Sequence, residues 1–266
     1  MLTIDLTGKQ ALVCGSTQGI GKAIAKEFAC AGASVILAAR NEKRLQETLR
    51  ELSLVVEGQR HNAICADFSR YEDVEHALKA FLETQGQPTI HLLVNNTGGP
   101  PPGAIVEAQA EAFVQAFSQH LLVSQRLVQH LLPAMKREGY GRVINIVSTS
   151  VKQPIANLGV SNTIRGAVSS WAKTLSFEVA SFGITVNNIL PGYVKTGRLE
   201  SLIASIAHNT GRSTSEIESE MIQTIPAGRF AEPSELASLA AFLASPLASY
   251  INGTSIAVDG GRTTAL

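Results

Sequence analysis

The sequence has no excess of either charge. Its 22 lysine and arginine residues balance 22 aspartate and glutamate residues, so the formal net charge is zero at neutral pH. No run of basic residues occurs along the chain. Nucleic acids and anionic membrane surfaces attract proteins through clustered positive charge. We therefore expect neither a nucleic acid nor a membrane as a partner.

Long apolar stretches are also missing. None reaches the roughly 20 residues that span a bilayer. The first residues, Met1 to Leu6, are too few and too polar to form a signal peptide. A cytoplasmic location is therefore expected.

Cysteine is scarce and odd in number. Cys14, Cys30 and Cys65 lie within strand or helix patterns, which favours buried free thiols over disulfides or metal ligands. No metal site is predicted. The sequence also has no internal repeat, linker or low-complexity tract, and its 266 residues, 45% of them hydrophobic, can bury a large core. We predict one α/β domain over residues 1–266.

The first thirty residues contain the clearest local pattern. An apolar, β-prone run, Gln10 to Cys14, leads into CGSTQGIG and then into a helical pattern from Ile20 to Ala31. Gly15 permits a tight turn, Gly19 permits close approach of a ligand, and Gly21 permits the helix to pack on the sheet. The N-terminus of the helix points at this loop, where a pyrophosphate would bind.

A second apolar run, Ser34 to Ala39, completes a βαβ unit and ends at Arg40 and Asn41. In such a unit the residue that closes the second strand meets the adenosine ribose. A carboxylate there would bind the 2′-hydroxyl, whereas the guanidinium of Arg40 suits a 2′-phosphate. NADP(H) is therefore favoured over NAD(H). In the alternative interpretation Arg40 is only solvated, and Gln18 stands in the loop where a second basic residue would have helped.

The remaining chain continues to alternate strands and helices. Strands are predicted at Asn62 to Phe68, His91 to Gly99, Gly141 to Ser150, Gly183 to Gly192 and Thr254 to Gly261, and helices at Asn41 to Leu52, Tyr71 to Thr84, about Glu111 to Lys136, about Leu158 to Ser181 and Pro233 to Ala244. The segment 197–225 is polar and weakly periodic, which predicts a mobile helical lid over a substrate.

Polar residues follow several of these strands. Asp67 suits a hydrogen bond from the adenine amino group or, alternatively, a helix cap. Asn95 could pin neighbouring strands and line the cofactor cleft. The segment GGPPPG, Gly98 to Gly103, predicts a stiff loop over the site. Ser148 stands at the C-terminal end of the fifth strand, where open α/β sheets bind ligands.

These motifs resemble, over essentially the whole chain, those of the short-chain dehydrogenase/reductase family. The matching pieces are CGSTQGIG, Arg40, Asp67, NNTG at Asn95 to Gly98, NIVS ending at Ser148, PGYVKT at Pro191 to Thr196, and DGG at Asp259 to Gly261. The resemblance implies a Rossmann-type, doubly wound, seven-stranded parallel sheet of order 3-2-1-4-5-6-7 with helices on both faces. It also implies a nicotinamide cofactor and hydride transfer to or from a carbonyl or alcohol carbon.

Among the branches of the family, the chain looks most like the β-ketoacyl-acyl-carrier-protein reductases, which implies a small-molecule or acyl-thioester substrate. The resemblance further implies a homodimer or homotetramer in which the helices from Glu111 and Leu158 form a four-helix contact. The cofactor-binding residues that it implies are Gly15, Ser16, Thr17, Gly19, Ile20, Gly21, Arg40, Asn41, Asp67, Phe68, Asn95, Thr97, Gly98, Arg165, Pro191, Gly192, Val194 and Thr196.

The chain departs from the family at the catalytic set of Asn, Ser, Tyr and Lys. The family's Y-x-x-x-K pair lies about 13 residues after the serine, and that position reads S-x-x-x-R here, with Ser161 and Arg165. Aligning the preceding helix by Pro133 places His120 where the asparagine is expected. Only Ser148 is retained. The stretch Asn157 to Val168 resembles a subgroup of reductase-like members with a similar departure.

The substitution matters because a carbonyl that accepts a hydride also needs a proton donor. The usual donor is a phenol with a pKa near 10, and a neighbouring ammonium group makes it able to donate its proton. Ser161 cannot replace a phenol, but Arg165 could clamp the nicotinamide ribose. Two substitute donors are available: His120, expected to have a pKa near neutrality, and Tyr193. Alternatively, His120 bonds to backbone and Tyr193 packs against the lid. The candidate catalytic residues are Ser148, Ser161, Arg165, His120 and Tyr193.

Three functions are consistent with these patterns. The first is an NADP(H)-dependent oxidoreductase in which Ser148 polarises the substrate oxygen and an unconventional group donates the proton. The second is a cofactor-binding protein without turnover, with a regulatory or partner-binding role. The third is a structural domain that binds no dinucleotide. The substrate is not readable, because the segment 197–225 and the loop 99–103 carry no chemical motif.

Overall fold

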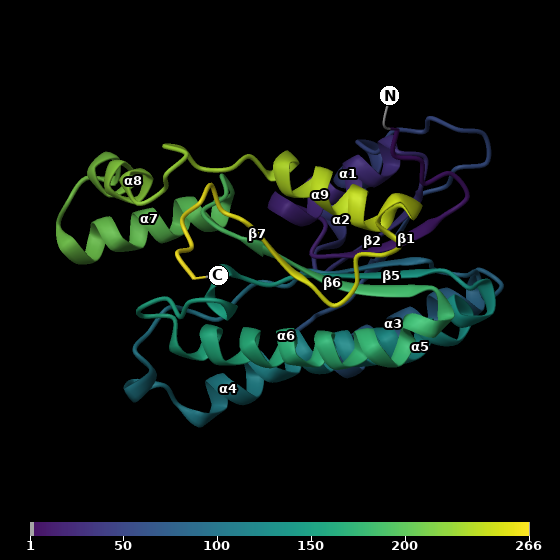
Figure 1. The fold of residues 1–266 in the computed structure, drawn as a ribbon, viewed down its shortest axis with the longest axis horizontal. Helices are drawn as coiled ribbons and strands as arrows, with labels where there is room; N and C mark the ends of the chain where they lie inside the picture. Colours follow the sequence, from purple (N-terminus) through teal and green to yellow (C-terminus); the bar gives the residue numbers. More distant parts are fainter. Residues whose placement is uncertain (1–2, 266) are drawn as a thin grey trace.

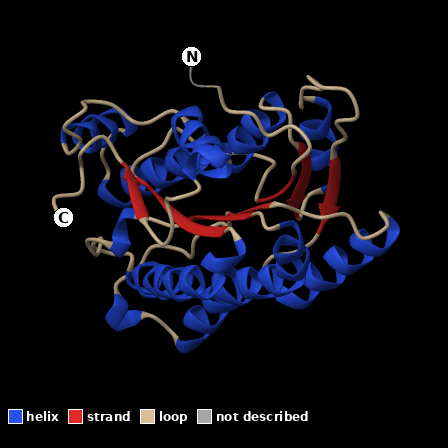
Figure 2. Cartoon of the chain, turned by 45° about the vertical axis from the view of Figure 1, so that its right-hand side comes forward, coloured by secondary structure: helices blue, strands red, loops and turns tan. Residues whose placement is uncertain are grey.

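The computed structural model describes residues 3–265. Seven parallel strands form one sheet in the order β3-β2-β1-β4-β5-β6-β7, which confirms the implied topology. The strands are β1 (Gln10–Cys14), β2 (Ser34–Ala39), β3 (Asn62–Cys65), β4 (Leu92–Asn95), β5 (Gly141–Ile146), β6 (Ile184–Pro191) and β7 (Ser255–Val258). Figure 2 shows the sheet as a twisted layer between helices.

Helices cover both faces of the sheet (Figure 1). One face packs against α1 (Gly19–Cys30), α2 (Glu42–Arg50) and α9 (Pro233–Ala244), and the other against α3 (Tyr71–Thr84), α5 (Val123–Glu138) and α6 (Gly159–Val179). Short 3-10 turns occur at η1 (Ile105–Glu107), η3 (Thr149–Val151), η4 (Ala180–Phe182) and η5 (Pro246–Ala248). No helix within residues 3–265 is both long and apolar enough to cross a membrane.

The apolar strands are buried on both sides. Ala11 and Val13 of β1 belong to the core under α1 and α9, whereas Leu12 and Cys14 belong to the core over α3 and α5. Successive side chains of a strand point to opposite faces. A strand covered on both faces therefore reads as a continuous apolar run, which is why these strands were predictable.

Four strands end three or more residues earlier than predicted. The strands expected to reach Phe68, Gly99, Ser150 and Gly261 end instead at Cys65, Asn95, Ile146 and Val258. The polar residues that follow form local hydrogen bonds rather than ladder bonds. For example, Ser148 Oγ accepts a hydrogen bond from the Ser150 N–H at 3.1 Å and thereby caps η3.

The long helix predicted from Glu111 to Lys136 is not continuous. It consists of α4 (Ala110–Phe117), a π-helical turn η2 (Ser118–Leu122) and α5. The π-turn contains His120. Such turns add a residue to a helix and often mark functional sites. Periodicity alone could not predict this turn, because the apolar pattern continues through it.

The three cysteines are free, as expected, but only Cys14 is buried. The prediction of buried thiols was wrong for Cys30 and Cys65, which are exposed. Cys65 closes β3, the edge strand of the sheet. An edge strand has a neighbour on one side only, so part of its surface stays open.

The segment predicted as a lid forms two helices, α7 (Gly197–Thr210) and α8 (Thr214–Gln223). They share a small apolar cluster separate from the two main cores, which consists of Leu199, Ile203, Ala207, Ile217, Met221, Ile225 and Phe230. A capping box between Ser213 and Glu216 begins α8. The two helices are therefore better packed than the weak periodicity of the segment indicated. Motion of the two helices stays a prediction.

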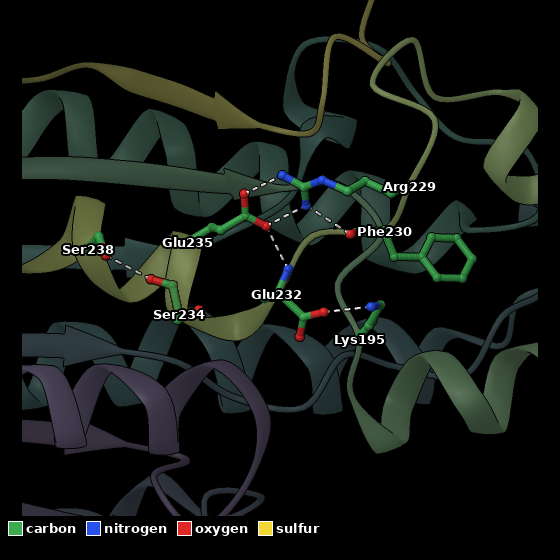
Figure 3. Close-up of polar contacts among 7 residues, drawn as sticks. All are labelled: Lys195, Arg229, Phe230, Glu232, Ser234, Glu235 and Ser238. Carbon is green, nitrogen blue, oxygen red and sulfur yellow. Dashed lines mark hydrogen bonds and ion pairs between the residues drawn. The ribbon is translucent and has the colours of Figure 1, made fainter.

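Ion pairs at the start of α9 anchor the segment that leads into α7 (Figure 3). Arg229 donates to both carboxylate oxygens of Glu235 at 2.7 Å. Glu235 also accepts the Glu232 N–H at 2.8 Å, and the Glu232 carboxylate accepts from Lys195 Nζ at 2.5 Å. Lys195 directly precedes the residue that caps α7, so this network ties α7 to the main fold.

The helices expected to join subunits expose apolar side chains. Val114 of α4 is 69% exposed and Phe177 of α6 is 71% exposed. The four-helix contact and the dimer or tetramer stay predictions.

Candidate active site

The glycine loop after β1 is packed too tightly for side chains. Gly15 has a φ of +60°, and a Cβ on it would lie 2.5 Å from the carbonyl oxygen of Asn96. A Cβ on Gly21 would lie 2.3 Å from the Gly15 carbonyl oxygen. The side chain of Asn96 donates to the carbonyls of Cys14 and Gly15 at 3.2 and 3.3 Å and closes the loop. Sequence reasoning missed Asn96, although it lies inside the NNTG motif.

The N-terminus of α1 is left open for a ligand. Its N-cap residue, Gln18, forms no side-chain cap, and the first turn contains no acidic residue. The first N–H groups of a helix have no intrahelical partners. Thr17, Gly19 and Ile20 are half-buried, whereas Ser16 is buried and its Oγ accepts the Ala38 N–H at 3.0 Å. Open amides and a positive dipole fit a pyrophosphate.

The turn after β6 faces this loop. Thr196 Cγ2 lies 3.1 Å from the Cβ position that Gly19 lacks. Thr196 also caps α7. Pro191 is the last residue of β6, and Gly192 and Val194 form backbone pairs with neighbouring segments. The structure thus brings two of the predicted cofactor-binding segments together.

Two arginines, Arg40 and Arg44, lie just after β2. Arg40 is exposed and lines a groove of about 520 Å³. Asn41 caps α2 by accepting the Arg44 N–H at 3.0 Å. The Arg44 guanidinium donates to Gln18 Oε1 at 3.0 Å and so reaches back to the glycine loop. Sequence reasoning missed Arg44, since only the fold shows where its side chain reaches.

Asp67 lines the same groove. Its Oδ1 accepts the Ser69 N–H at 3.0 Å, a hydrogen bond that lowers the pKa of the carboxyl group. The helix-cap alternative for Asp67 was wrong, because the N-cap of α3 is Arg70. Phe68 is buried in the core. A contact of Asp67 with adenine stays a prediction.

A ladder of amide side chains crosses the sheet at one register. Asn95 of β4 donates to Asn145 of β5 at 2.8 Å, Asn145 donates to Asn188 of β6 at 2.9 Å, and Asn188 donates to Ser255 of β7 at 3.0 Å. The prediction that Asn95 pins neighbouring strands is confirmed. Its Oδ1 has no hydrogen-bond partner within residues 3–265.

Next to this ladder lies a small polar cavity. His120 Nδ1 lies 2.6 Å from the Thr97 hydroxyl oxygen, and His120 Nε2 has no partner in the described part of the chain. His120, Asn95 and Arg165 line a cavity of about 20 Å³, enough for one water molecule. Two unpartnered polar atoms, one on His120 and one on Asn95, therefore share this cavity.

Arg165 extends from α6 to the end of β5. Its Nη1 donates to the carbonyls of Ile146 and Val147 at 3.1 and 2.6 Å. Ser148 follows directly, and because its Oγ accepts a backbone N–H, its own proton stays available to a ligand. Ser161, one turn before Arg165, is buried and does not line the cavity.

The charges at this site differ from expectation. Burial, with the nearby charges of Arg165 and Arg198, lowers the pKa of His120 to about 3. The prediction of a pKa near neutrality was therefore wrong, and the imidazole is neutral at physiological pH. Burial and the charge of Arg198 lower the pKa of Arg165 to about 10, so this guanidinium stays charged at neutral pH.

The low pKa of His120 makes stability depend on pH. Below about pH 6.5 the imidazole of His120 is protonated in the unfolded chain but stays neutral in the folded chain. Stability is therefore lost as the pH falls from about 6.5 toward 3.

Between pH 7 and pH 5 we expect the free energy of unfolding, measured in urea, to fall by about 1–2 kcal/mol more in the wild-type protein than in His120→Gln. The exposed His208→Gln serves as the control and should lose as much as wild type. Equal pH dependence in wild type and His120→Gln would contradict the assigned pKa.

Tyr193 lies apart from the cavity. Its hydroxyl accepts from Arg262 Nη2 at 3.2 Å, and its ring packs edge-on against Phe230 with the ring centroids 6.0 Å apart. The alternative in which Tyr193 packs against the lid matches this geometry.

The loop after β4 is tied to its surroundings. The Gly98 carbonyl accepts from Gln119 at 3.0 Å, and the Pro100 carbonyl accepts from Arg198 Nη2 at 3.1 Å. Arg198 is the second residue of α7. Within residues 3–265 no three His, Cys, Asp or Glu side chains gather in a way that could hold a metal ion.

Comparison with known proteins gives matches over nearly the whole chain. A family model described as enoyl-(acyl carrier protein) reductase matches residues 15–263. The 3-oxoacyl-(acyl-carrier-protein) reductase FabG of Vibrio cholerae is 33% identical, over 97% of this chain and 98% of that protein. The NADPH-dependent reductase BacG of Bacillus subtilis is 30% identical, over 98% and 100%.

A solved structure agrees as closely. L-sorbose reductase of Gluconobacter frateurii, complexed with NADPH and L-sorbose, superposes with a TM-score of 0.91 at 31% identity, over 100% of both chains. The sequence relatives, the sheet order and the glycine loop point to one conclusion. The chain belongs to the short-chain dehydrogenase/reductase family of NAD(P)-dependent oxidoreductases, close to its ketoreductases.

Proposed function

We propose that the protein is an NADPH-dependent reductase that converts a carbonyl to an alcohol, or catalyses the reverse oxidation. The observation that carries the proposal is the meeting of His120 and Arg165 at the carboxyl edge of the sheet, where Arg165 binds the carbonyl of Val147, the residue before Ser148. The relatives named above support NADPH as the cofactor. They act on substrates as different as acyl-carrier-protein thioesters and a sugar, so they leave the substrate open.

The residues present fit this cofactor along its length. The open amides at the start of α1 would hold the pyrophosphate. Arg40, supported by Arg44, would hold the 2′-phosphate. Arg165 would contact the nicotinamide ribose. When bound, NADPH supplies the hydride that adds to the carbonyl carbon, and a proton added to the oxygen completes the alcohol.

The chain's own residues stabilise the charge that develops on the substrate oxygen. Ser148 donates a hydrogen bond from its hydroxyl to that oxygen and keeps its proton, since the Ser150 N–H already fixes the Oγ. If Nδ1 of His120 accepts from Thr97, Nε2 carries the proton and serves as a second, neutral donor. The positive charge of Arg165 favours the alkoxide. Water, rather than a phenol, supplies the final proton.

The test is oxidation of NADPH by purified protein with a panel of ketones, β-ketoacyl thioesters and oxo acids. Turnover that is lost in Ser148→Ala supports the reductase. Tight NADPH binding without oxidation by any of these substrates would instead favour a cofactor-binding protein without turnover. That alternative rests on the absence of the Tyr and Lys pair.

Restoring the usual pair is expected to fail. In Ser161→Tyr/Arg165→Lys the phenol must enter a buried position, and the lysine side chain is one bond too short to place its nitrogen where Arg165 Nη1 donates to the Ile146 and Val147 carbonyls. We expect lower turnover than wild type and a loss of about 1–3 kcal/mol of stability. Urea unfolding and NADPH oxidation with a generic ketone measure both effects, with Arg165→Lys alone for comparison. A double variant more active than wild type would contradict this expectation, because it would mean that the pocket still accepts the family's Tyr and Lys pair.

A further inference from the structure

Two guanidinium groups converge above the loop that follows β4. Arg165 Nη2 lies 3.3 Å, and Arg198 Nη2 lies 3.6 Å, from the Cβ position that Gly99 lacks. Apart from the chain neighbours Gly98 and Pro100, no other atom of residues 3–265 lies within 4 Å of that position. Both side chains are held in place, Arg165 by the carbonyls at the end of β5 and Arg198 by the Pro100 carbonyl.

Neither guanidinium is neutralised by a carboxylate of residues 3–265. Within residues 3–265 neither Arg165 nor Arg198 forms an ion pair with an aspartate or glutamate. By contrast, Arg212 pairs with Glu220 at 2.7 Å and Arg229 pairs with a glutamate at the same distance. Two cations that share a site without a carboxylate repel each other. An anion between them would remove this cost.

A second observation concerns the other side of Arg165. His120 is only 6% exposed, its Nε2 has no partner among residues 3–265, and the residue lines a cavity together with Arg165. Its ring is close enough to Arg165 and Arg198 for both charges to act on it. A buried polar atom without a partner is costly. One water molecule in this cavity would supply the missing partner and could connect His120 to a polar ligand held by Arg165.

We propose that the substrate carries a carboxylate, and that Arg165 and Arg198 hold this group above Gly99. The inference rests on the proposed reductase function. The Ile146 and Val147 carbonyls occupy Nη1 of Arg165 and leave its Nη2 to donate to a carboxylate, and Arg198 donates with the N–H groups that the Pro100 carbonyl does not use. The substrate class is then an oxo acid, which is reduced to a hydroxy acid while NADPH becomes NADP⁺ and one proton is taken up.

The geometry also places the carboxylate near the reacting carbon. Arg165 binds the Val147 carbonyl, one residue from Ser148, which would hold the carbonyl oxygen. The two groups of the substrate are therefore separated by few bonds, as in a 2-oxo or 3-oxo acid. An acyl-carrier-protein thioester has no carboxylate there, because its only nearby anion is the phosphate at the far end of its arm. A small free acid fits the site better than an acyl thioester.

The test compares two acids, pyruvate and acetoacetate, with their neutral methyl esters. We expect wild-type protein to favour the better acid over its ester by about 10- to 100-fold in kcat/KM. In Arg198→Gln this acid-to-ester ratio should fall by about the same factor. Arg212→Gln removes the same charge from the same helical segment and should keep the ratio.

Binding provides a readout that does not require turnover. The NADPH complex is titrated calorimetrically with 3-hydroxybutyrate, which NADPH cannot reduce, and with its methyl ester. We expect the acid to bind more tightly than the ester, and Arg198→Gln to lose about 10-fold or more of that affinity.

The failures of the two proposals are distinguishable. Esters reduced and bound as well as acids would overturn the oxo-acid inference and leave the reductase in place. A tenfold loss of NADPH affinity in Arg198→Gln, with the acid-to-ester ratio kept, would assign the arginine to a cofactor phosphate and also overturn it. Failure of the wild-type protein to bind NADPH would instead reject the proposed function.

Discussion

Ser148→Ala is expected to lower kcat by about 10²- to 10³-fold, the usual effect of removing one donor to a developing oxyanion. Ser148 is the member of the family's catalytic set that we predict this chain to keep. Its Oγ accepts the Ser150 N–H, so the position of the oxygen is fixed and its own proton stays available to a ligand. The measurement is NADPH oxidation with the best substrate of the panel, together with the dissociation constant of NADPH, which should stay close to the wild-type value because the α1 amides are untouched.

Ser170→Ala is the matched control, since Ser170 is exposed on the same helix as Arg165 but away from the strand ends. It should behave as wild type. Full activity in Ser148→Ala would remove the serine from the reaction and leave His120 as the donor to the substrate oxygen. Loss of NADPH binding in that variant would show that the segment after β5 supports the cofactor instead.

Arg40→Asp is expected to weaken NADPH binding by about 100-fold or more and to strengthen NADH binding. The variant loses a charge-assisted hydrogen bond, which typically contributes about 1.5–3 kcal/mol, and adds repulsion between the new carboxylate and the 2′-phosphate. The same carboxylate accepts a hydrogen bond from the 2′-hydroxyl of NADH. Arg44→Gln should act in the same direction but less, because Arg44 is partly engaged by Gln18. Fluorescence titration with both nucleotides measures the ratio.

The control for this charge reversal is Arg60→Asp, an exposed arginine outside the groove at the end of β2. It should leave the ratio of NADPH to NADH affinity as in wild type. An unchanged ratio in Arg40→Asp would mean that the 2′-phosphate binds elsewhere, with Arg44 as the next candidate.

Much of the fold was predictable because its strands are buried on both faces. The run Gln10 to Cys14 is apolar at nearly every position, and both of its faces are covered by helices. The glycine loop was also predictable, because the packing around Gly15 and Gly21 leaves no space for a Cβ. Such requirements are local, so they are visible in the sequence.

The less predictable features depend on contacts between distant segments. Arg44 reaches Gln18, Asn96 closes the glycine loop, and Arg198 reaches Pro100, 98 positions away. No periodicity encodes these contacts. The predicted pKa of His120 was wrong for the same reason. Burial in a π-turn and the charges of two arginines from other helices lower the pKa of this residue.

The order in α7 and α8 was underestimated because their apolar residues face each other. A stripe that covers only a partner helix is narrow, so the sequence appears weakly periodic. Leu199, Ile203 and Ile217 nevertheless share one cluster. If Arg198 holds the substrate carboxylate as we propose, its position at the start of α7 connects these helices to the substrate.

The most direct test of this account is a crystal structure of the protein with NADPH. We predict the pyrophosphate against the backbone amides of Gly19 and Ile20, the 2′-phosphate beside Arg40, and the nicotinamide facing the hydroxyl of Ser148. A nucleotide bound elsewhere, or a glycine loop occupied by the protein's own side chains after soaking, would contradict it.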